Sequence, residues 1–202
     1  MNTVITISRE FGSGGRELGR RLAEKLDVAY YDQEIISEIS KHTELSEQYV
    51  SQITEKCPYI PFPITVGRSL SAWYNNIDLQ TSVQIFSIQK QIIEEMAQKS
   101  DCVIVGRCAD YILRDYRPIR IFVYGSLKSK IMRCKNNAPE QEHLSDKDLV
   151  REINRIDKNR AEYYHFYTDQ EWGDKINYDI CVNTTYMSIK DISESFIKLK
   201  TK

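Results

Sequence analysis

The 202-residue sequence has almost no net charge and no hydrophobic run long enough to cross a membrane. Its 28 basic and 29 acidic residues give a formal net charge of −1. The molecule as a whole therefore has no electrostatic bias toward nucleic acid or membrane surfaces, and any anion that it binds must be held by a local cluster of cations. Only a few apolar residues precede Arg9 and Glu10, so no signal peptide is expected in this stretch.

Cysteine and histidine are too scattered to indicate a metal site. The chain has three histidines, and none of its five cysteines forms a Cys-x-x-Cys pair. Free thiols in a reducing cytoplasm are the expected state, because three of the cysteines lie in or beside apolar runs. The five are Cys57, Cys102, Cys108, Cys134 and Cys181.

Short apolar segments are present instead of long ones. They are rich in β-branched residues, nearly continuous, and separated by helical patterns, which predicts buried strands of a parallel sheet covered on both faces. The four segments are 4–7, 102–105, 119–123 and 178–182, and a shorter run at 28–31 could be a fifth strand. Chain length and an apolar content of 41% suit one α/β domain with insertions.

Helical periodicity fills the intervals between these segments. Leu18, Leu22 and Leu26 recur every four residues and predict a first helix with a buried leucine stripe. Ser145, with Asp148 three residues later, is typical of a helix N-terminus. Further helices are expected over 33–41, 46–56, 79–99 and 145–164.

A glycine-rich stretch, Phe11-Gly12-Ser13-Gly14-Gly15-Arg16-Glu17, connects the first strand to the first helix. Unpaired backbone N–H groups at a helix N-terminus bind phosphate, and glycines let the backbone wrap closely around an anion. We therefore expect a phosphate-binding loop. A strand-to-helix turn without a ligand is the alternative, whereas a dinucleotide-binding Gly-x-Gly-x-x-Gly pattern fits poorly because its third glycine falls on Glu17.

The loop departs from the usual ending, Gly-Lys-Ser or Gly-Lys-Thr, at two places. Arg16 takes the place of the lysine, and its planar guanidinium can bind phosphate oxygens in pairs. Glu17 takes the place of the hydroxyl that usually holds magnesium. It could ligate magnesium, or cap the helix as an acidic residue of the first turn, which is the favoured interpretation.

The opening stretch from Ile5 to Asp32 resembles the cytidylate kinase-like branch of the P-loop nucleoside monophosphate kinases, including its arginine in place of the usual lysine. Three later segments resemble the same enzymes in order and spacing: 103–110, 151–161 and 178–192. Two details differ. Cys108 and Ala109 separate Arg107 from Asp110, and Ile153 stands where the family's lid helix has an additional arginine.

The resemblance implies a three-layer α/β P-loop NTPase fold with a central parallel sheet, a helical monophosphate-binding insertion and a helical lid. It places a single domain over 1–202. The core is expected at about 1–32, 101–134 and 177–202, the insertion at about 33–100, and the lid at about 135–176.

The resemblance also implies an activity, the ATP-dependent transfer of a phosphoryl group to a nucleoside monophosphate, with CMP and dCMP as the first candidates. ATP is expected over Gly12 to Glu17, with Mg²⁺ between its phosphates. Charge for the transfer is expected from Arg16, Arg155 and Arg160, because this reaction depends on neutralising the phosphoryl group in transit. Four residues are expected to hold the acceptor: Asp32, Arg107, Asp110 and Asp157.

Each of these residues also has an ordinary structural interpretation. Asp32 could be the N-cap of the helix that follows it, and Arg107 a solvated loop arginine. Asp157 and Arg160, three apart on one helix, could belong to a charged helix surface. The aromatic run 163–167 is expected to pack the lid on the core.

A second function remains open: a nucleotide-binding module or sensor without monophosphate kinase activity, or a kinase of another small acceptor. The altered loop, Ile153 and an insertion without a readable specificity motif support it. Pro58–Pro63 and Trp73-Tyr74 could serve a different ligand or a dimer contact, and Arg68 is a further candidate phosphate ligand. The expected partners are small nucleotides, not a nucleic acid polymer or a membrane, and a homodimer is compatible with the sequence.

Overall fold

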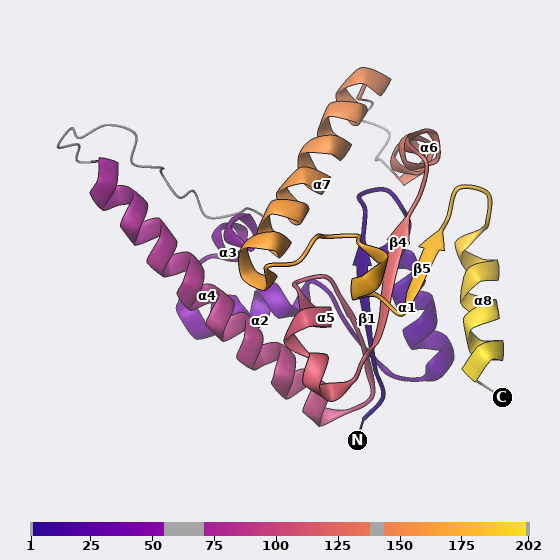
Figure 1. The fold of residues 1–202 in the computed structure, drawn as a ribbon, viewed down its shortest axis with the longest axis horizontal. Coiled ribbons are helices and arrows are strands. Elements are labelled where there is room, and N and C mark those ends of the chain that lie inside the picture. The colour runs from indigo at the N-terminus through magenta and orange to yellow at the C-terminus, as the bar shows by residue number, and fades with distance from the viewer. Residues whose placement is uncertain (1, 55–70, 138–143, 201–202) are drawn as a thin grey trace.

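The computed structural model describes residues 2–54, 71–137 and 144–200 (Figure 1). Five parallel strands form one sheet in the order β2-β3-β1-β4-β5. They are β1 (Val4–Arg9), β2 (Ala29–Tyr31), β3 (Cys102–Val105), β4 (Ile119–Tyr124) and β5 (Ile180–Asn183). The predicted parallel sheet is confirmed, including its fifth strand.

Strand β1 lies at the centre of the sheet and is buried along its whole length. Its residues pair with β3 on one side, as in Ile7 with Val105, and with β4 on the other, as in Arg9 with Val123. Because parallel strands end at the same edge, β1 delivers the glycine-rich loop to the edge where β3 and β4 also end.

Helices cover both faces of the sheet (Figure 1). They are α1 (Gly15–Leu26), α2 (Glu34–Thr43), α3 (Glu47–Ile53), α4 (Ser71–Lys99), α5 (Ala109–Ile112), α6 (Leu127–Asn137), α7 (Asp146–Thr168) and α8 (Ile189–Lys200), with 3₁₀ turns at Arg114–Tyr116 and Lys175–Asn177. Within the described ranges, no helix combines the length and apolar character needed to cross a membrane.

Alternating strand residues build two separate cores. Ile5 and Ile7 pack with α1 and α8, whereas Val4 packs with α2, α3, α4 and α5 on the opposite face. Leu18 and Leu22 of the predicted stripe are buried in the first of these cores. Because both faces are covered, the strands read as nearly continuous apolar runs.

The predicted helices are present with shifted boundaries. Helix α4 begins at Ser71, eight residues before the expected start, and α7 continues to Thr168. Ser145 is the N-cap of α7, and its hydroxyl accepts a hydrogen bond of 3.2 Å from the Asp148 N–H. Helices α5 and α6 were not among the predictions.

Aromatic residues join α7 to α4, whereas the predicted packing of the run 163–167 on the core is seen at Tyr163 and Tyr164, which belong to the buried cluster that contains Val4. The rings of Phe86 and Tyr167 stack at 3.9 Å, and Tyr163 lies 4.7 Å from Tyr167. Pro58–Pro63 and Arg68 lie outside the described residues, as do the side chains of Trp73 and Tyr74.

Candidate functional site

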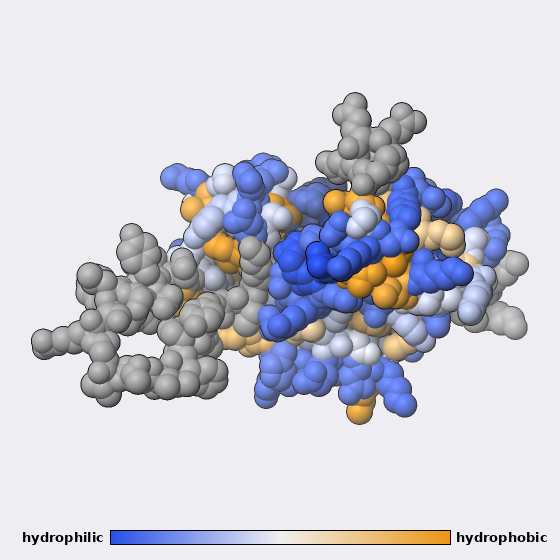
Figure 2. Space-filling model, turned by 90° about the horizontal axis from the view of Figure 1, so that it is seen from above, coloured by the Kyte–Doolittle hydropathy of each residue, from blue (hydrophilic) through white to orange (hydrophobic). Residues whose placement is uncertain are grey.

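The glycine-rich loop borders a cavity of about 830 Å³ at the edge where the strands end. Residues of the loop, the first turn of α1, α6 and α7 line it. Viewed from this side, hydrophilic residues gather in the middle of the face, with hydrophobic residues beside them (Figure 2). The volume suits a nucleotide-sized ligand, and the lining combines apolar residues with arginines that could meet its phosphates.

The loop has the backbone of a phosphate cradle. Gly12 and Gly14 adopt left-handed φ angles of 72° and 87°, and α1 begins directly afterwards with Gly14 as an N-cap that supplies no side-chain bond. A Cβ on Gly14 would lie 2.6 Å from Ile189. Buried Ser13 donates to the Glu10 carbonyl at 2.8 Å, and Thr184 donates to the Ser13 carbonyl at 2.8 Å. The loop is thus held from both sides with its helix N-terminus available to an anion.

Arg16 and Glu17 both line this cavity. The Nε atom of Arg16 lies 2.8 Å from Asp32 Oδ2, and about half of the Arg16 side chain is exposed. Glu17 occupies the first turn of α1, but its carboxylate accepts from Arg21 Nε at 2.8 Å, so its observed partner is a side chain. Glu17 therefore makes no capping hydrogen bond within the described part of the chain, and what remains of its predicted capping role is the favourable interaction of its charge with the N-terminal end of the helix dipole.

Asp32 is buried at the end of β2 and is not a helix N-cap, a position held by Gln33. Its two oxygens face two arginines: Oδ2 pairs with Arg16, and Oδ1 lies 3.8 Å from Arg9 Nη2. The structure thus brings a predicted acceptor residue to the edge of the phosphate loop.

Arg9 was not predicted as a site residue. It is 8% exposed, although it carries a guanidinium at the end of the central strand. An arginine inside a fully buried strand, directly before a glycine-rich loop, is the signal that could have found it, because buried charges require a partner.

A second, smaller cavity of about 40 Å³ lies beside Arg9, toward the end of β3. Arg107 lines it and is 7% exposed, so it is not a solvated loop arginine. Its Nη1 donates to the Thr54 carbonyl at 3.0 Å and to the Thr54 hydroxyl at 2.6 Å. Among the described residues, the lining consists of Ser8, Arg9, Thr54, Gly106, Arg107, Cys108, Arg160, Tyr163, Tyr164 and Trp172.

Asp110 lies behind this small cavity rather than in its wall. It is 4% exposed, and burial raises the pKa of its carboxyl despite the hydrogen bonds that it accepts. Tyr164, which does line the cavity, donates to Asp110 at 2.7 Å, and Ser8 donates to its other oxygen at 3.4 Å. Asp110 therefore holds the hydroxyl groups of two residues that line the cavity, Tyr164 and Ser8.

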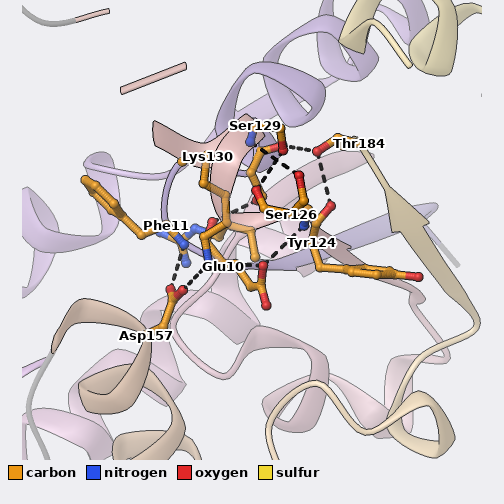
Figure 3. Close-up of polar contacts among 12 residues, drawn as sticks. Glu10, Phe11, Tyr124, Ser126, Ser129, Lys130, Asp157 and Thr184 are labelled. Carbon is orange, nitrogen blue, oxygen red and sulfur yellow. Dashed lines mark hydrogen bonds and ion pairs between the residues drawn. The ribbon is translucent and has the colours of Figure 1, made fainter. Parts of the chain in front are cut away.

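Helix α7 contacts the loop through Arg160 and Asp157. Arg160 Nη1 donates to the Arg9 carbonyl at 3.0 Å. Asp157 accepts from the Phe11 N–H at 2.6 Å and from Lys130 Nζ at 2.7 Å (Figure 3). The structure thus gives Asp157 a role in fastening α7 to the loop.

Arg155 points elsewhere. Its Nε donates to Glu152 at 2.9 Å, about half of its side chain is exposed, and it lines neither of the two cavities. Ile153, at the place of the missing lid arginine, is fully buried and contributes packing instead of charge. Of the two predicted arginines on α7, the structure brings Arg160 to the loop.

A model of the cytidylate kinase-like family matches residues 4–186. The chain belongs to this family. No protein in a search of curated proteins matches it. Family membership makes it a kinase-like protein, for which ATP use with Mg²⁺ is typical.

Solved structures show the same architecture as this cytidylate kinase-like chain. An uncharacterized protein from Eubacterium ventriosum ATCC 27560 is 27% identical, with a TM-score of 0.70 and 98% of each chain covered. A shikimate kinase from Bacteroides thetaiotaomicron is 14% identical, with a TM-score of 0.57 and 99% of each chain covered. A shikimate kinase from Acinetobacter baumannii in complex with shikimate is 16% identical, with a TM-score of 0.51, over 100% of this chain and 94% of that one. The predicted P-loop kinase fold is confirmed.

The kinase-like site offers few ligands to a metal ion. The described residues include no group of three or more His, Cys, Asp or Glu side chains that could hold one. Mg²⁺ in nucleotide sites is commonly bound by one or two carboxylates together with the phosphates, so this lining fits an ion that arrives with the nucleotide. Glu17 is the predicted carboxylate that lines the cavity.

Proposed function

We propose that this cytidylate kinase-like protein transfers the γ-phosphoryl group of ATP to a nucleoside monophosphate. One observation carries the proposal: of the described residues, Arg9 and Arg160 line both the loop cavity and the small cavity. Two anion-binding sites that meet at two guanidinium groups fit a reaction in which a phosphoryl group passes from one site to the other.

The loop cavity would take the donor. Its amides at Gly12 to Gly15 cradle the phosphates, and Arg16 adds charge from the rim. When bound with the nucleotide, Mg²⁺ supplies further charge neutralisation between the phosphates, with Glu17 as its proposed ligand.

The small cavity would take the phosphate of the acceptor. Arg107 enters it from the turn after β3, held by Thr54 of the α3 end and by Gln89 of α4, whose amide donates to the Arg107 carbonyl at 3.0 Å. Two segments of 33–100 thus shape the acceptor side, which supports the proposal that 33–100 binds the monophosphate. Helix α7, within 135–176, would act as the lid that closes over both ligands.

A phosphate acceptor suits these residues because it needs no general base. A phosphate monoester has a second pKa of about 6 and is mostly ionised at neutral pH. Its oxygen attacks the γ-phosphorus in line and forms the new P–O bond. The bond from the γ-phosphorus to the β,γ-bridging oxygen breaks, and its electron pair stays on ADP. Arg9 and Arg160 would stabilise the charge on the group in transit.

ADP release tests the proposal directly. CMP, dCMP, UMP and AMP are offered with ATP and Mg²⁺, and we expect release that depends on one of them, with a cytidylate as the best acceptor. Shikimate, the ligand of one structural neighbour, serves as an acceptor without a phosphate. Release with none of the nucleotides contradicts the proposal. ATP binding by calorimetry without any transfer would then support the nucleotide-binding module.

The cytoplasm is the proposed location. Cys102 and Cys108 are buried free thiols, which suits a reducing compartment. A homodimer remains a proposal, to be measured by light scattering.

A further inference from the structure

Two glycines leave the space that the Arg9 side chain occupies. A Cβ added to Gly15 would overlap the Cβ of Arg9, and a Cβ added to Gly106 would overlap its guanidinium. These glycines belong to different segments: Gly15 begins α1, and Gly106 follows β3. The absence of a side chain at these two positions therefore leaves room for the Arg9 side chain from its Cβ to its guanidinium.

The charge of Arg9 is poorly compensated within the protein. Its Nε has no hydrogen-bond partner among the described residues, and Asp32 lies 3.8 Å from its Nη2. Burial lowers the pKa of Arg9 most, and Arg160, Arg107 and Arg16 lower it further, while Asp32 raises it. A buried cation surrounded by other cations is unfavourable unless an anion joins it.

The sequence pattern of the loop has a second alignment that includes Arg9. The pattern Gly-x-x-x-x-Gly-Lys-Ser/Thr can be placed with Arg9 at its first glycine and Gly14 at its second. Gly15 then stands at the position of the lysine. The Arg9 side chain occupies the space that any side chain at Gly15 would enter. The cation absent from position 15 is therefore supplied by Arg9, whose side chain reaches the same place from the end of β1.

We propose that Arg9 replaces the phosphate-loop lysine and binds the terminal phosphate of the donor at the junction of the two cavities. This inference rests on the proposed function, because it assigns the loop cavity to a nucleoside triphosphate. It also changes the role of Arg16, whose half-exposed side chain pairs with Asp32 and orients that carboxylate toward Arg9. Arg9 is then the catalytic arginine of the strand, and Arg16 a positioning residue.

Nucleotide affinity tests Arg9 without any acceptor. Calorimetry compares ATP and ADP, each with Mg²⁺, for the wild type, Arg9→Lys and Arg9→Gln. Loss of a charge-assisted bond to the terminal phosphate should weaken ATP binding by Arg9→Gln about ten- to a hundredfold, and ADP binding much less. Arg9→Lys should retain part of the ATP affinity. Arg114→Ala, at an exposed arginine outside both cavities, is the control and should bind as the wild type does.

A charge transplant gives the second test. Gly15→Lys alone should be unstable, because its side chain enters the space of Arg9. Arg9→Gly combined with Gly15→Lys should fold and bind ATP more tightly than Arg9→Gly does, since it restores the usual arrangement. Thermal unfolding identifies any variant that does not fold. If Arg9→Gly does not fold, the difference in ATP affinity between Arg9→Lys and Arg9→Gln still measures the effect of a positive charge at position 9.

The outcomes separate the two proposals. Equal losses of ATP and ADP affinity in Arg9→Gln, or no loss of either, overturn the role of Arg9 even if the wild type phosphorylates CMP. A selective loss of ATP affinity in a protein that phosphorylates no nucleotide supports Arg9 and overturns the acceptor assignment.

Discussion

Arg107 lies in a backbone turn that few residues other than glycine adopt. Gly106, Arg107 and Cys108 have successive φ values of 77°, 58° and 53°, all left-handed. Such a conformation costs about 1 kcal/mol or more for each non-glycine residue and persists where surrounding contacts enforce it. Here the contacts are those of Arg107 with Thr54 and Gln89. This strained turn places the Arg107 guanidinium in the wall of the small cavity.

Asp110 illustrates how burial changes the chemistry of a single residue. Burial raises its pKa, because a carboxylate loses its hydration inside the core, and hydrogen bonds from Tyr164 and Ser8 oppose this only in part. A folded-state pKa above the unfolded one gives stabilisation that is present at low pH and is lost as the pH rises through the folded value.

The variant Asp110→Asn should remove this pH dependence. As the pH rises above 3.8, the ordinary value for this carboxyl, the free energy of unfolding of the wild type should decline relative to that of the variant. Urea unfolding of both proteins between pH 4 and pH 8 measures the difference, in which contributions from other titrating groups cancel. A difference that stays constant over this range contradicts the expectation.

At the scale of elements, a buried lysine joins α6 to α7 and the loop. Lys130 has 7% of its side chain exposed and lies 2.7 Å from Asp157 and 3.2 Å from Glu10. Glu10 also accepts from the Gly125 N–H, and Asp157 from the Phe11 N–H (Figure 3). One cluster therefore fixes the middle of α7, the helix of the proposed lid, to the phosphate loop.

Asp157→Asn should loosen this junction. The change leaves buried Lys130 with Glu10 as its remaining carboxylate, so we expect a loss of about 1–3 kcal/mol in the free energy of unfolding by urea. Asp148→Asn is the matched control on the same helix. Its carboxylate is about half exposed and pairs with Arg151, so its loss should be within about 1 kcal/mol. Equal losses for the two variants would show that the cluster does not stabilise the junction.

Helix α6 shows which elements the sequence pattern could not predict. Its buried positions include Ser129 and Lys130, so it carries no apolar stripe of helical period. Polar contacts with the loop, such as Arg133 with the Gly12 carbonyl, hold it instead. Helix α1, by contrast, was predicted from its leucines, because burial against a sheet imposes that period.

At the scale of the whole molecule, the residues of the candidate site lie together at one edge of the sheet. The ends of β1, β2 and β3 bring Arg9, Asp32 and Arg107 together although almost a hundred residues separate the first from the last. Helix α7 adds Arg160 from a still later segment. Because the donor would bind across several of these segments, its binding should stabilise the fold as a unit.

ATP with Mg²⁺ should therefore raise the thermal unfolding midpoint. A ligand at 100 times its Kd stabilises by about 2.7 kcal/mol, which corresponds to about 5–11 °C for a chain of this size. Differential scanning fluorimetry measures the shift, and adenosine at the same concentration, which lacks phosphates, should give little. An equal shift with adenosine would contradict a site built around the phosphate loop.

The sequence alone determined the parallel sheet, the first helix of the core and the position of the phosphate loop, because burial on two faces and a glycine-rich helix start leave local patterns. It also indicated Asp32, Arg107 and Arg160, through their resemblance to a known family. Only the tertiary structure decided which charges meet. Arg9 passes beside Gly15 and Gly106 and faces Asp32, Arg155 pairs with its own helix, and Asp157 fastens α7 to the loop. Such pairings depend on distances between segments far apart in the chain, which no local pattern records.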